Sequence, residues 1–458
     1  MLANALTIKK YINNKMKYFI YILIESIKNL YFLYQSFLIF FEYGMLRIIN
    51  YDSQLCFNHF VNQLAELNIF YVKIFQSICT NNFILDNEQI EYLYNFTDEV
   101  PFTSNDIDTL IEYNIKQTAK QENHIISLDK QGENLFPYKS GAVSLVYKGK
   151  LNNEEIVVKV LRKNIKQKLT NALNRIDFVC KIFGKFPYLY TLNLSQLVEE
   201  NKEMLLSQVN FANEVTNIQE MYKNCLHTDY VKIPMVYPEY TNNNNNIIVM
   251  EKLNGSKLNE INKDEKEIYC DVLAKFSIKC ILYNRLYHAD LHPGNILFLK
   301  ENEKYKIGII DYGIMGHLTK DEQNYYYNLL KTISTTTDYQ DVIDIVLKGL
   351  VEPKNKLNYL SKLEYNKLRL ELSYILNKEF HVSGPNNIRG PNNITGTDVF
   401  KINSILSKHN LFLSKNFCKV QLCMAISDSV IRKLSDKTTY MNNIKDNMLS
   451  LFGNVGHT

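Results

Sequence analysis

The chain has 458 residues, of which 46% are hydrophobic, and its formal net charge is +4. This apolar content supports one large core or two to three ordinary ones, and it excludes global disorder. The small positive charge, with no Lys/Arg-rich run, argues against a nucleic-acid-binding protein. Eight cysteines form no CxxC pair and no metal-ligand spacing, which is typical of buried thiols in a reducing compartment.

The most apolar stretch, residues 18–41, predicts a helix with a narrow polar stripe. Lys28, Gln35 and Glu42 recur every seven residues, and the rest of the circumference is apolar. Such a helix can lie in a membrane interface, span the membrane if Glu25 pairs with Lys28, or pack against its own protein. The first 24 residues contain four lysines and no acid, a weak resemblance to an organellar presequence.

The texture of the sequence then changes twice. Helical periodicity continues to about residue 130, and short β-rich pieces follow, such as "AVSLVYKGKL", "EEIVVKVL" and "NIIVMEKL". Long helical stretches dominate after residue 255, which favours a bilobal α+β architecture. The run Asn242–Asn246 is predicted to be a loop inserted between two strands. We expect an apolar N-terminal segment at residues 1–50 and a helical extension at 51–130. A β-rich N-lobe with a helical insert at 162–212 is expected at 131–253, and a helical C-lobe at 254–458.

The stretch "HADLHPGNILF", residues 288–298, carries the strongest chemical signal. Pro293 and Gly294 predict a turn that lets Asp290 and Asn295 converge, and the apolar tail predicts a strand. In the catalytic loop of a kinase-like fold, the Asp orients or deprotonates the attacking hydroxyl and the Asn binds Mg²⁺.

A second acidic position follows in "IGIIDYGIMG". Asp311 ends an apolar, strand-like run and is followed by Tyr-Gly, which fits the metal-binding element of a kinase-like site. Carboxylate and amide oxygens at adjacent strand ends suit a hard cation. We therefore predict that Asn295 and Asp311 hold Mg²⁺.

Upstream residues supply the remaining parts of a nucleotide site. Lys159, in "EEIVVKVLR", is expected to hold the α- and β-phosphates of ATP and to pair with Glu214 on a helix. Alone, each of these residues is as consistent with a surface lysine or a helix-face acid, but their order along the chain indicates a protein-kinase-like ATP site. The predicted catalytic residues are therefore Asp290, Lys159 and Glu214.

Two backbone elements complete the predicted ATP site. "SGAVSLVYKG" is expected to cover the phosphates, with Gly141, Ser144 and Val146 at the positions of a glycine-rich loop. "IIVMEKLNG" is expected to bind adenine through backbone groups at Met250, Glu251 and Leu253.

The sequence resembles the UbiB-like (aarF-domain) atypical kinases, a family linked to coenzyme Q biosynthesis. The resemblance runs from about residue 55 to 440. It rests on "YVKIFQSICT" at 71–80, the long insert between Lys159 and Glu214, and "GIMGHLTKDEQ" after Asp311 with no Ala-Pro-Glu motif. It implies ATPase or small-molecule phosphotransfer at a membrane, with a lipid or quinone-pathway molecule as partner and a mitochondrial location.

The resemblance also assigns a regulatory extension. Lys73 and Gln76 match the family's KxGQ segment, but Phe75 replaces its glycine, where a ring would collide or force a shift. Gln208 and Asn210 replace the acidic residues of the family's Glu-x-Asp pair, so a Lys73 salt bridge is lost and only an amide hydrogen bond remains available. We therefore expect a loosened or rebuilt regulatory lock on a retained ATP and Mg²⁺ site.

Two alternative functions remain open at this point. Aminoglycoside and choline kinases also carry an HxDLHxGN loop, so a small-molecule phosphotransferase is one. The other is a pseudokinase scaffold that binds nucleotide without turnover; the presence of Lys159, Asn295 and Asp311 argues against it.

Overall fold

The structure is a computed structural model that describes residues 2–49, 51–80, 86–98, 100–132, 134–183, 202, 205–335, 339–380, 396–435, 437–438 and 440–453. The chain divides into two units. Unit 1 comprises Met1–Glu112, Lys130–Tyr147 and Lys159–Val209, and unit 2 comprises Tyr113–Asp129, Lys148–Val158 and Asn210–Thr458. The four-part division along the chain stays a prediction.

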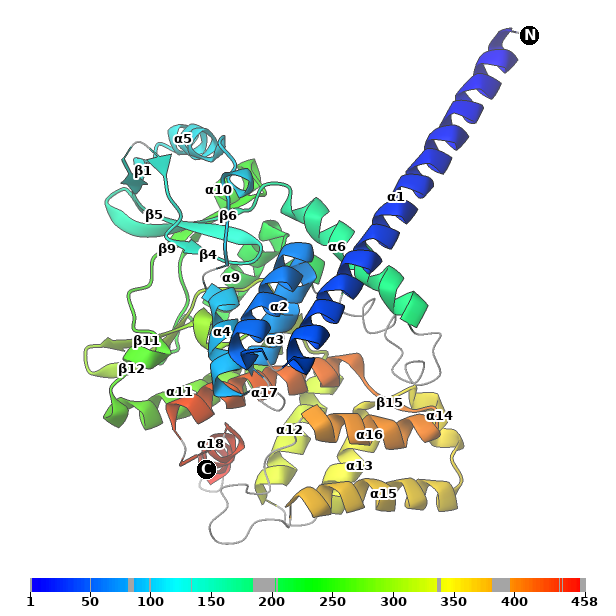
Figure 1. Ribbon diagram of the computed structural model, residues 1–458. Coiled ribbons are helices and arrows are strands. Elements are labelled where there is room, and N and C mark those ends of the chain that lie inside the picture. The colour runs from blue at the N-terminus through cyan, green and yellow to red at the C-terminus, as the bar shows by residue number, and fades with distance from the viewer. Residues whose placement is uncertain are drawn as a thin grey trace. The chain divides into compact units, whose positions relative to one another are not determined.

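Unit 1 is mostly helical, and an apolar cluster holds its helices α1–α4 together. Asp52 begins the second helix by accepting a hydrogen bond from the backbone of Leu55 at 2.8 Å. Figure 1 shows α2, α3 and α4 side by side. The described helices of unit 1 are α1 (Leu2–Ile48), α2 (Ser53–Leu67), α3 (Ile69–Thr80), α4 (Asn87–Asp98), the short η1 (Ser104–Asp106) and α6 (Ile165–Phe183). The cluster between α1–α4 includes Ile39, Phe57, Val61, Phe75, Phe96 and, from the β-rich region, Ala142.

The long helix α1 has two different halves. Its second half packs against α2 and α6 and buries Phe32, Ser36 and Ile39 at helical spacing. Residues 15–24, by contrast, are exposed around the whole circumference. Lys28 Nζ lies 2.8 Å from Glu25 Oε1, so the predicted pair forms. Among the described residues, no helix is both long and apolar enough to cross a membrane.

A six-stranded sheet carries the β-rich pieces that the sequence predicts. Its strands run in the order β1-β5-β6-β9-β8, and β4 pairs with β5. Asn152 and Asn153 connect β5 to β6 with φ of 47° and 72°, a conformation that asparagine tolerates in a two-residue hairpin. The unit boundaries fall within β5 and β6. The strands are β1 (Ile126–Leu128), β4 (Lys139–Ser140), β5 (Ser144–Leu151), β6 (Glu154–Leu161), β8 (Val236–Tyr237) and β9 (Ile247–Glu251), and a separate small hairpin is formed by β2 (Lys130–Gln131) and β3 (Asn134–Leu135).

Helices also form most of unit 2. Helix α11 (Lys266–Ile278) buries eight of its 13 residues and packs against α17 and α18, as Figure 1 shows. The other helices are α5 (Ile111–Gln121), which crosses the unit boundary, α9 (Phe211–Cys225), α10 (Pro238–Asn243), η2 (Leu258–Glu260), η3 (Lys263–Glu265), the π-helix η4 (Lys279–Asn284), η5 (Pro293–Asn295), α12 (Lys320–Thr335), α13 (Tyr339–Gly349), α14 (Lys354–Tyr359), α15 (Lys362–Phe380), α16 (Gly396–Lys408), α17 (Lys415–Leu434) and α18 (Tyr440–Gly453).

Short strands in unit 2 place the motif loops. Strand β11 (Ile296–Glu301) pairs with β12 (Lys304–Ile309), which also pairs with β7 (Val231–Lys232). Strand β10 (Leu286–His288) pairs with β13 (Met315–His317). A further pair is formed by β14 (Val351–Glu352) and β15 (Phe412–Leu413). The strands predicted after Asn295 and before Asp311 are therefore confirmed as β11 and β12.

The asparagine run departs from its prediction. Asn242 and Asn243 end helix α10, so the loop prediction is wrong for these two residues. Pro238 occupies the first turn of α10, where its fixed φ favours a helix start. Asn243 Nδ2 then donates to Gln121 Oε1 at 3.2 Å, a contact that no local pattern encodes.

Candidate functional site

The loop between β10 and β11 brings Asp290 and Asn295 together. Asn295 Nδ2 donates to the backbone carbonyl oxygen of Asp290 at 2.8 Å. Within the turn, the Asn295 backbone N–H bonds the His292 carbonyl at 2.9 Å, and Gly294 N–H bonds His292 Nδ1 at 3.1 Å. Asn295 is buried and Asp290 is half-buried, so the carboxylate retains access to solvent. The turn thus brings the Asn295 side chain to the Asp290 backbone, and the convergence of the two side chains stays a prediction.

The loop after β12 lies directly beside the first one. Ile310 N–H donates to the carbonyl oxygen of Asn295 at 3.1 Å, which joins the two loops through their backbones. Gly313 N–H donates to Asp311 Oδ1 at 3.0 Å and so fixes the carboxylate. Asp311 itself is half-buried.

His288 connects both loops through its two ring nitrogens. Nε2 lies 2.6 Å from the carbonyl oxygen of Asp311, and Nδ1 lies 3.2 Å from the backbone nitrogen of Asp290. A carbonyl only accepts and an amide N–H only donates, so the imidazole carries its proton on Nε2. Burial lowers the pKa of His288 and favours this neutral form. The sequence showed this histidine inside the motif but gave it no role.

A buried tyrosine follows Asp311 and meets the helix that carries Glu214. The Tyr312 backbone N–H lies 3.4 Å from Glu214 Oε1, and Asn217 Nδ2 donates to the Tyr312 carbonyl at 2.9 Å. The Tyr312 ring packs edge-on against His288 at 5.8 Å between centroids. Glu214 is only 3% exposed. The predicted helix acid therefore lies beside the residue that follows Asp311, and Asn217 is a contact that the sequence missed.

The predicted phosphate-binding lysine belongs to the other unit. Lys159 lies on β6 and is 5% exposed, and the unit boundary falls between Val158 and Lys159. A lysine so deeply buried needs partners for its charge. Its pairing with Glu214 would join the two units and stays a prediction.

The segment predicted to cover the phosphates contains a tight turn before β5. Gly141 precedes β5, and its N–H donates to the Ser144 carbonyl at 2.9 Å, which closes a tight turn. Ser144 is buried, and Val146 pairs with Lys139 in the β4–β5 ladder. These residues build a turn rather than an open glycine-rich loop.

The predicted adenine-binding residues lie at the end of β9. Met250 and Leu253 are buried, and Glu251 is held by Lys232, whose Nζ lies 2.8 Å from Glu251 Oε1. The Lys252 backbone N–H donates to the Glu155 carbonyl at 3.0 Å, which fixes the exit from the strand.

The extension residues present a mixed result. Phe75 is 5% exposed and packs edge-on against Phe96 at 5.6 Å, so helices α3 and α4 accommodate its ring in the core of unit 1. Gln208 Oε1 is buried without a hydrogen-bond partner among the described residues, so the amide bond from Lys73 that the sequence left available is absent there. Asn210 instead caps α9 by accepting from Asn213 N–H at 3.3 Å. The side chain of Gln76 lies outside the described residues.

The donor set of the two loops fits a hard cation. Because Asn295 Nδ2 faces the Asp290 carbonyl, Oδ1 is the atom that can act as a ligand, together with the Asp311 carboxylate. Across the described part of the chain, no group of three or more His, Cys, Asp or Glu residues has metal-site geometry. The six cysteines whose side chains the structure describes are free thiols: Cys56, Cys180, Cys225, Cys270, Cys280 and Cys423.

Comparisons with known proteins agree with this geometry. The chain is 26% identical over 298 residues to a protein named "Probable protein kinase UbiB" from Tolumonas auensis, covering 63% of this chain and 53% of that protein. It is also 26% identical over 306 residues to the protein of the same name from Marinobacter nauticus, covering 64% and 54%. The chain thus spans about half the length of the curated relatives it matches.

A solved structure gives a weaker likeness. The Rv3197–erythromycin complex from Mycobacterium tuberculosis aligns with a TM-score of 0.42 at 15% identity, covering 65% of this chain and 73% of that one.

The family match covers the site itself. The ABC1 atypical kinase-like domain matches residues 95–346, more than half of the chain, and this range contains Lys159, Glu214, Asp290 and Asp311. The α+β, kinase-like fold class and the resemblance to UbiB-like kinases are therefore confirmed. The chain belongs to the ABC1 atypical kinase-like family.

Proposed function

We propose that the chain binds ATP with Mg²⁺ and acts as an atypical kinase or ATPase. The observation that carries the proposal is the pair of bonds made by His288, which hold the backbones of Asp290 and Asp311 in adjacent loops. A phosphoryl-transfer site needs this arrangement, because catalysis depends on positioning and electrostatic stabilisation more than on covalent chemistry.

Each residue has a defined part in the proposed reaction. Asp290 orients the hydroxyl or water that attacks the γ-phosphate. Asn295 and Asp311 would hold Mg²⁺, and the metal would supply positive charge to the phosphates. Lys159 binds the α- and β-phosphates and is held in place by Glu214, the turn at Gly141–Val146 covers the phosphates, and Met250, Glu251 and Leu253 bind adenine.

We further propose that the activity serves a membrane lipid pathway, with a quinone-type ring compound as partner. The name of the UbiB relatives supports the pathway, and the exposed apolar side chains at the start of α1 support contact with a membrane surface. The scattered free thiols support a location in a reducing compartment. The resemblance to UbiB-like kinases supports a mitochondrial location.

The altered extension motif supports a weaker regulatory lock. Gln208 Oε1 has no hydrogen-bond partner within the described residues, so it adds no bond between the Lys73 segment and the helical insert. If the lock is loosened but still present, Lys73→Ala retains magnesium-dependent nucleotide binding and shows higher phosphotransfer. No change in either quantity would count against regulation by this segment.

One experiment tests the proposed activity and its alternatives. ATP consumption by the purified full chain is measured with and without liposomes and quinone-ring compounds, while the γ-phosphate is traced. Phosphate release, or transfer to a ring compound, that disappears in Asp311→Asn supports the proposal. Transfer to a soluble amino-sugar or choline acceptor would identify a small-molecule kinase, and ATP binding without turnover would identify a scaffold.

A further inference from the structure

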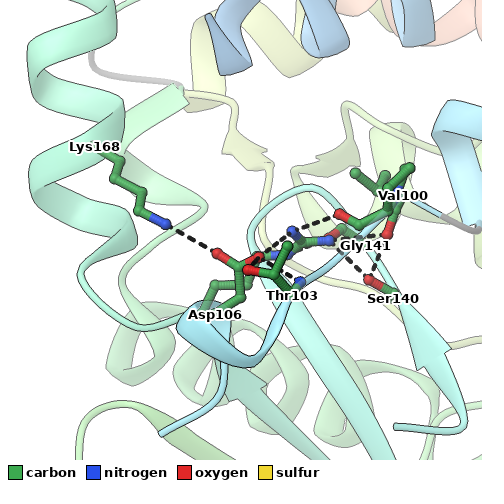
Figure 2. A network of polar contacts seen from close by, with 8 residues as sticks. Val100, Thr103, Asp106, Ser140, Gly141 and Lys168 are labelled. Carbon is green, nitrogen blue, oxygen red and sulfur yellow. Dashed lines mark hydrogen bonds and ion pairs between the residues drawn. The ribbon is translucent and has the colours of Figure 1, made fainter. Parts of the chain in front are cut away.

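A buried arginine connects two separate stretches of unit 1. The Arg162 guanidinium donates to the carbonyl oxygens of Val100 at 3.0 Å, Pro101 at 2.9 Å and Gly141 at 3.0 Å. It also donates to Ser140 Oγ at 2.7 Å, and only 7% of the residue is exposed. Figure 2 shows Val100, Ser140 and Gly141 gathered around this network. One side chain therefore ties the segment after α4 to the turn after β4.

Asp106 supplies the opposite charge. Its Oδ2 lies 3.4 Å from Arg162 Nη1 and accepts from Thr103 N–H at 3.0 Å, while Lys168 Nζ donates to Oδ1 at 2.9 Å (Figure 2). Burial acts to raise the pKa of Asp106, but the hydrogen bonds from Lys168 and Thr103 and the charge of Arg162 outweigh it, so the pKa is lowered. The carboxylate is therefore ionised at neutral pH and compensates the buried guanidinium.

The turn is also attached through its backbone and its apolar tip. Arg162 N–H donates to the Val143 carbonyl at 2.9 Å, and Val100 N–H donates to the Ser140 carbonyl at 2.8 Å. Ala142, at the tip, is 3% exposed and belongs to the apolar cluster formed by α1–α4. The turn that is expected to cover the phosphates is thus attached to the N-terminal helical extension through Val100 and the apolar cluster, and to Arg162 through the Val143 carbonyl.

The Gly141–Ser144 turn is held by Arg162 and residues 100–106, whereas a glycine-rich loop moves freely. A loop rich in glycine can close around phosphates by backbone rotation, whereas this turn has one glycine and a fixed attachment. Arginine suits the task because its planar fork reaches several acceptors at once, which a lysine ammonium cannot do in the same geometry. The position of the turn therefore depends on Arg162.

We propose that Arg162 is a positioning residue for nucleotide phosphates: it holds the Gly141–Ser144 turn against residues 100–106 and so makes phosphate recognition depend on the helical extension. The proposal rests on the proposed ATP site. It differs from the assignment of the KxGQ segment, because the acceptors of the Arg162 side chain lie at residues 100–106 and 140–141.

The test compares the affinities of the full chain for ATP and for adenosine, both measured with Mg²⁺ present. In Arg162→Lys the turn loses the guanidinium bonds to Gly141 and Ser140, so ATP affinity falls by about tenfold, the size of one lost charge-assisted hydrogen bond. Adenosine affinity stays unchanged, because the adenine site does not involve the turn. Lys168→Met is the matched control: it removes a charge from Asp106 without touching the turn, so its ATP-to-adenosine ratio stays that of the wild type.

A second variant and a second readout keep the outcomes separate. Ser140→Ala removes the hydrogen bond that Ser140 Oγ accepts from Arg162 and the one it donates to the Val100 carbonyl at 2.7 Å, but it leaves the bond from Arg162 to Gly141, so it is expected to lower the ratio about threefold or less. Hydrogen exchange of residues 136–147 in the nucleotide-free protein is expected to quicken in Arg162→Lys but not in Lys168→Met. A folded Arg162→Lys protein with a wild-type ratio overturns the inference; if that variant unfolds, an unchanged ratio in Ser140→Ala does so. A wild type that binds neither ATP nor adenosine overturns the proposed function itself.

Discussion

The loops around Asp290 and Asp311 and the turn at Gly141–Ser144 are held in place by different means. In the first region His288 bonds Asp290, two residues away, and Asp311, 23 residues away in the second loop. In the second region Arg162 acts across 21 residues to Gly141 and 62 residues to Val100. The bonds of His288 start in a motif that can be read from the sequence, whereas no local pattern marks the acceptors of Arg162, which therefore looks like an ordinary arginine.

The largest effect on ATP turnover is expected in the loops around Asp290 and Asp311. Asp311→Asn keeps an oxygen that can accept from Gly313 N–H but removes the charge that we propose holds Mg²⁺. We expect ATP turnover to fall at least about a hundredfold with the unfolding free energy nearly unchanged, since metal binding contributes several kcal/mol to the transition state. Steady-state ATP hydrolysis measures this, with the exposed Asp321→Asn as the control. Equal losses in both variants would contradict the assignment.

His288→Ala is expected to affect both activity and stability. It removes the two bonds that align Asp290 and Asp311 and leaves a cavity, so we expect a loss of about 2–4 kcal/mol of unfolding free energy. We also expect kcat to fall about tenfold or more, because the two carboxylates are no longer held in the geometry that the reaction needs. Urea unfolding and kcat are measured together. Cys423→Ser serves as the control, because a serine hydroxyl can still donate to the His288 carbonyl, to which Cys423 Sγ lies at 2.7 Å. A normal kcat in a folded His288→Ala variant would show that His288 is not needed to align Asp290 and Asp311.

The pH dependence of stability probes the Arg162 region. The folded pKa of Asp106 is depressed, so its contribution is fully present above the unfolded value of about 3.9 and is lost as pH falls through the folded pKa. Wild type should exceed Asp106→Asn by about 1–3 kcal/mol at pH 7, and the gap should close below about pH 4. Denaturant unfolding at stepped pH measures the gap. A gap that persists unchanged at pH 3 would show that charge is not what Asp106 provides.

The smallest effect is expected at the glycine of the turn. A Cβ at Gly141 would meet only ordinary contacts, 3.5 Å from the Ser144 carbonyl oxygen, so Gly141→Ala should change stability by no more than about 0.5 kcal/mol. In Gly149→Ala the Cβ would press on the Ser127 carbonyl oxygen and lie 2.9 Å from Leu128 Cδ2, so about 1–3 kcal/mol should be lost. Thermal unfolding of both variants tests the contrast. A large loss in Gly141→Ala would mean that the turn needs a glycine backbone.

Sequence reasoning predicted the elements whose causes are local. The apolar run before Asp311 became β12, the β-branched run around Lys159 became β6, and the apolar tail after Asn295 became β11. These follow from residue type and period, which neighbouring residues determine.

The contacts that the sequence did not predict join segments that are far apart in the chain. The contacts of Asn243 with Gln121 and of Arg162 with Val100 depend on which segments meet after folding, and neither leaves a periodic trace. His288 could have been found, since a buried histidine two residues before an acid in a turn can bond that acid's backbone.

The most direct test of the central claim is equilibrium ATP binding by calorimetry, with excess Mg²⁺ and with a chelator. The account predicts that ATP affinity rises with Mg²⁺ and that the rise disappears when Asn295 is changed to Ala or Asp311 to Asn. Affinity that is equal with and without the metal, or a metal effect that survives both substitutions, would contradict it.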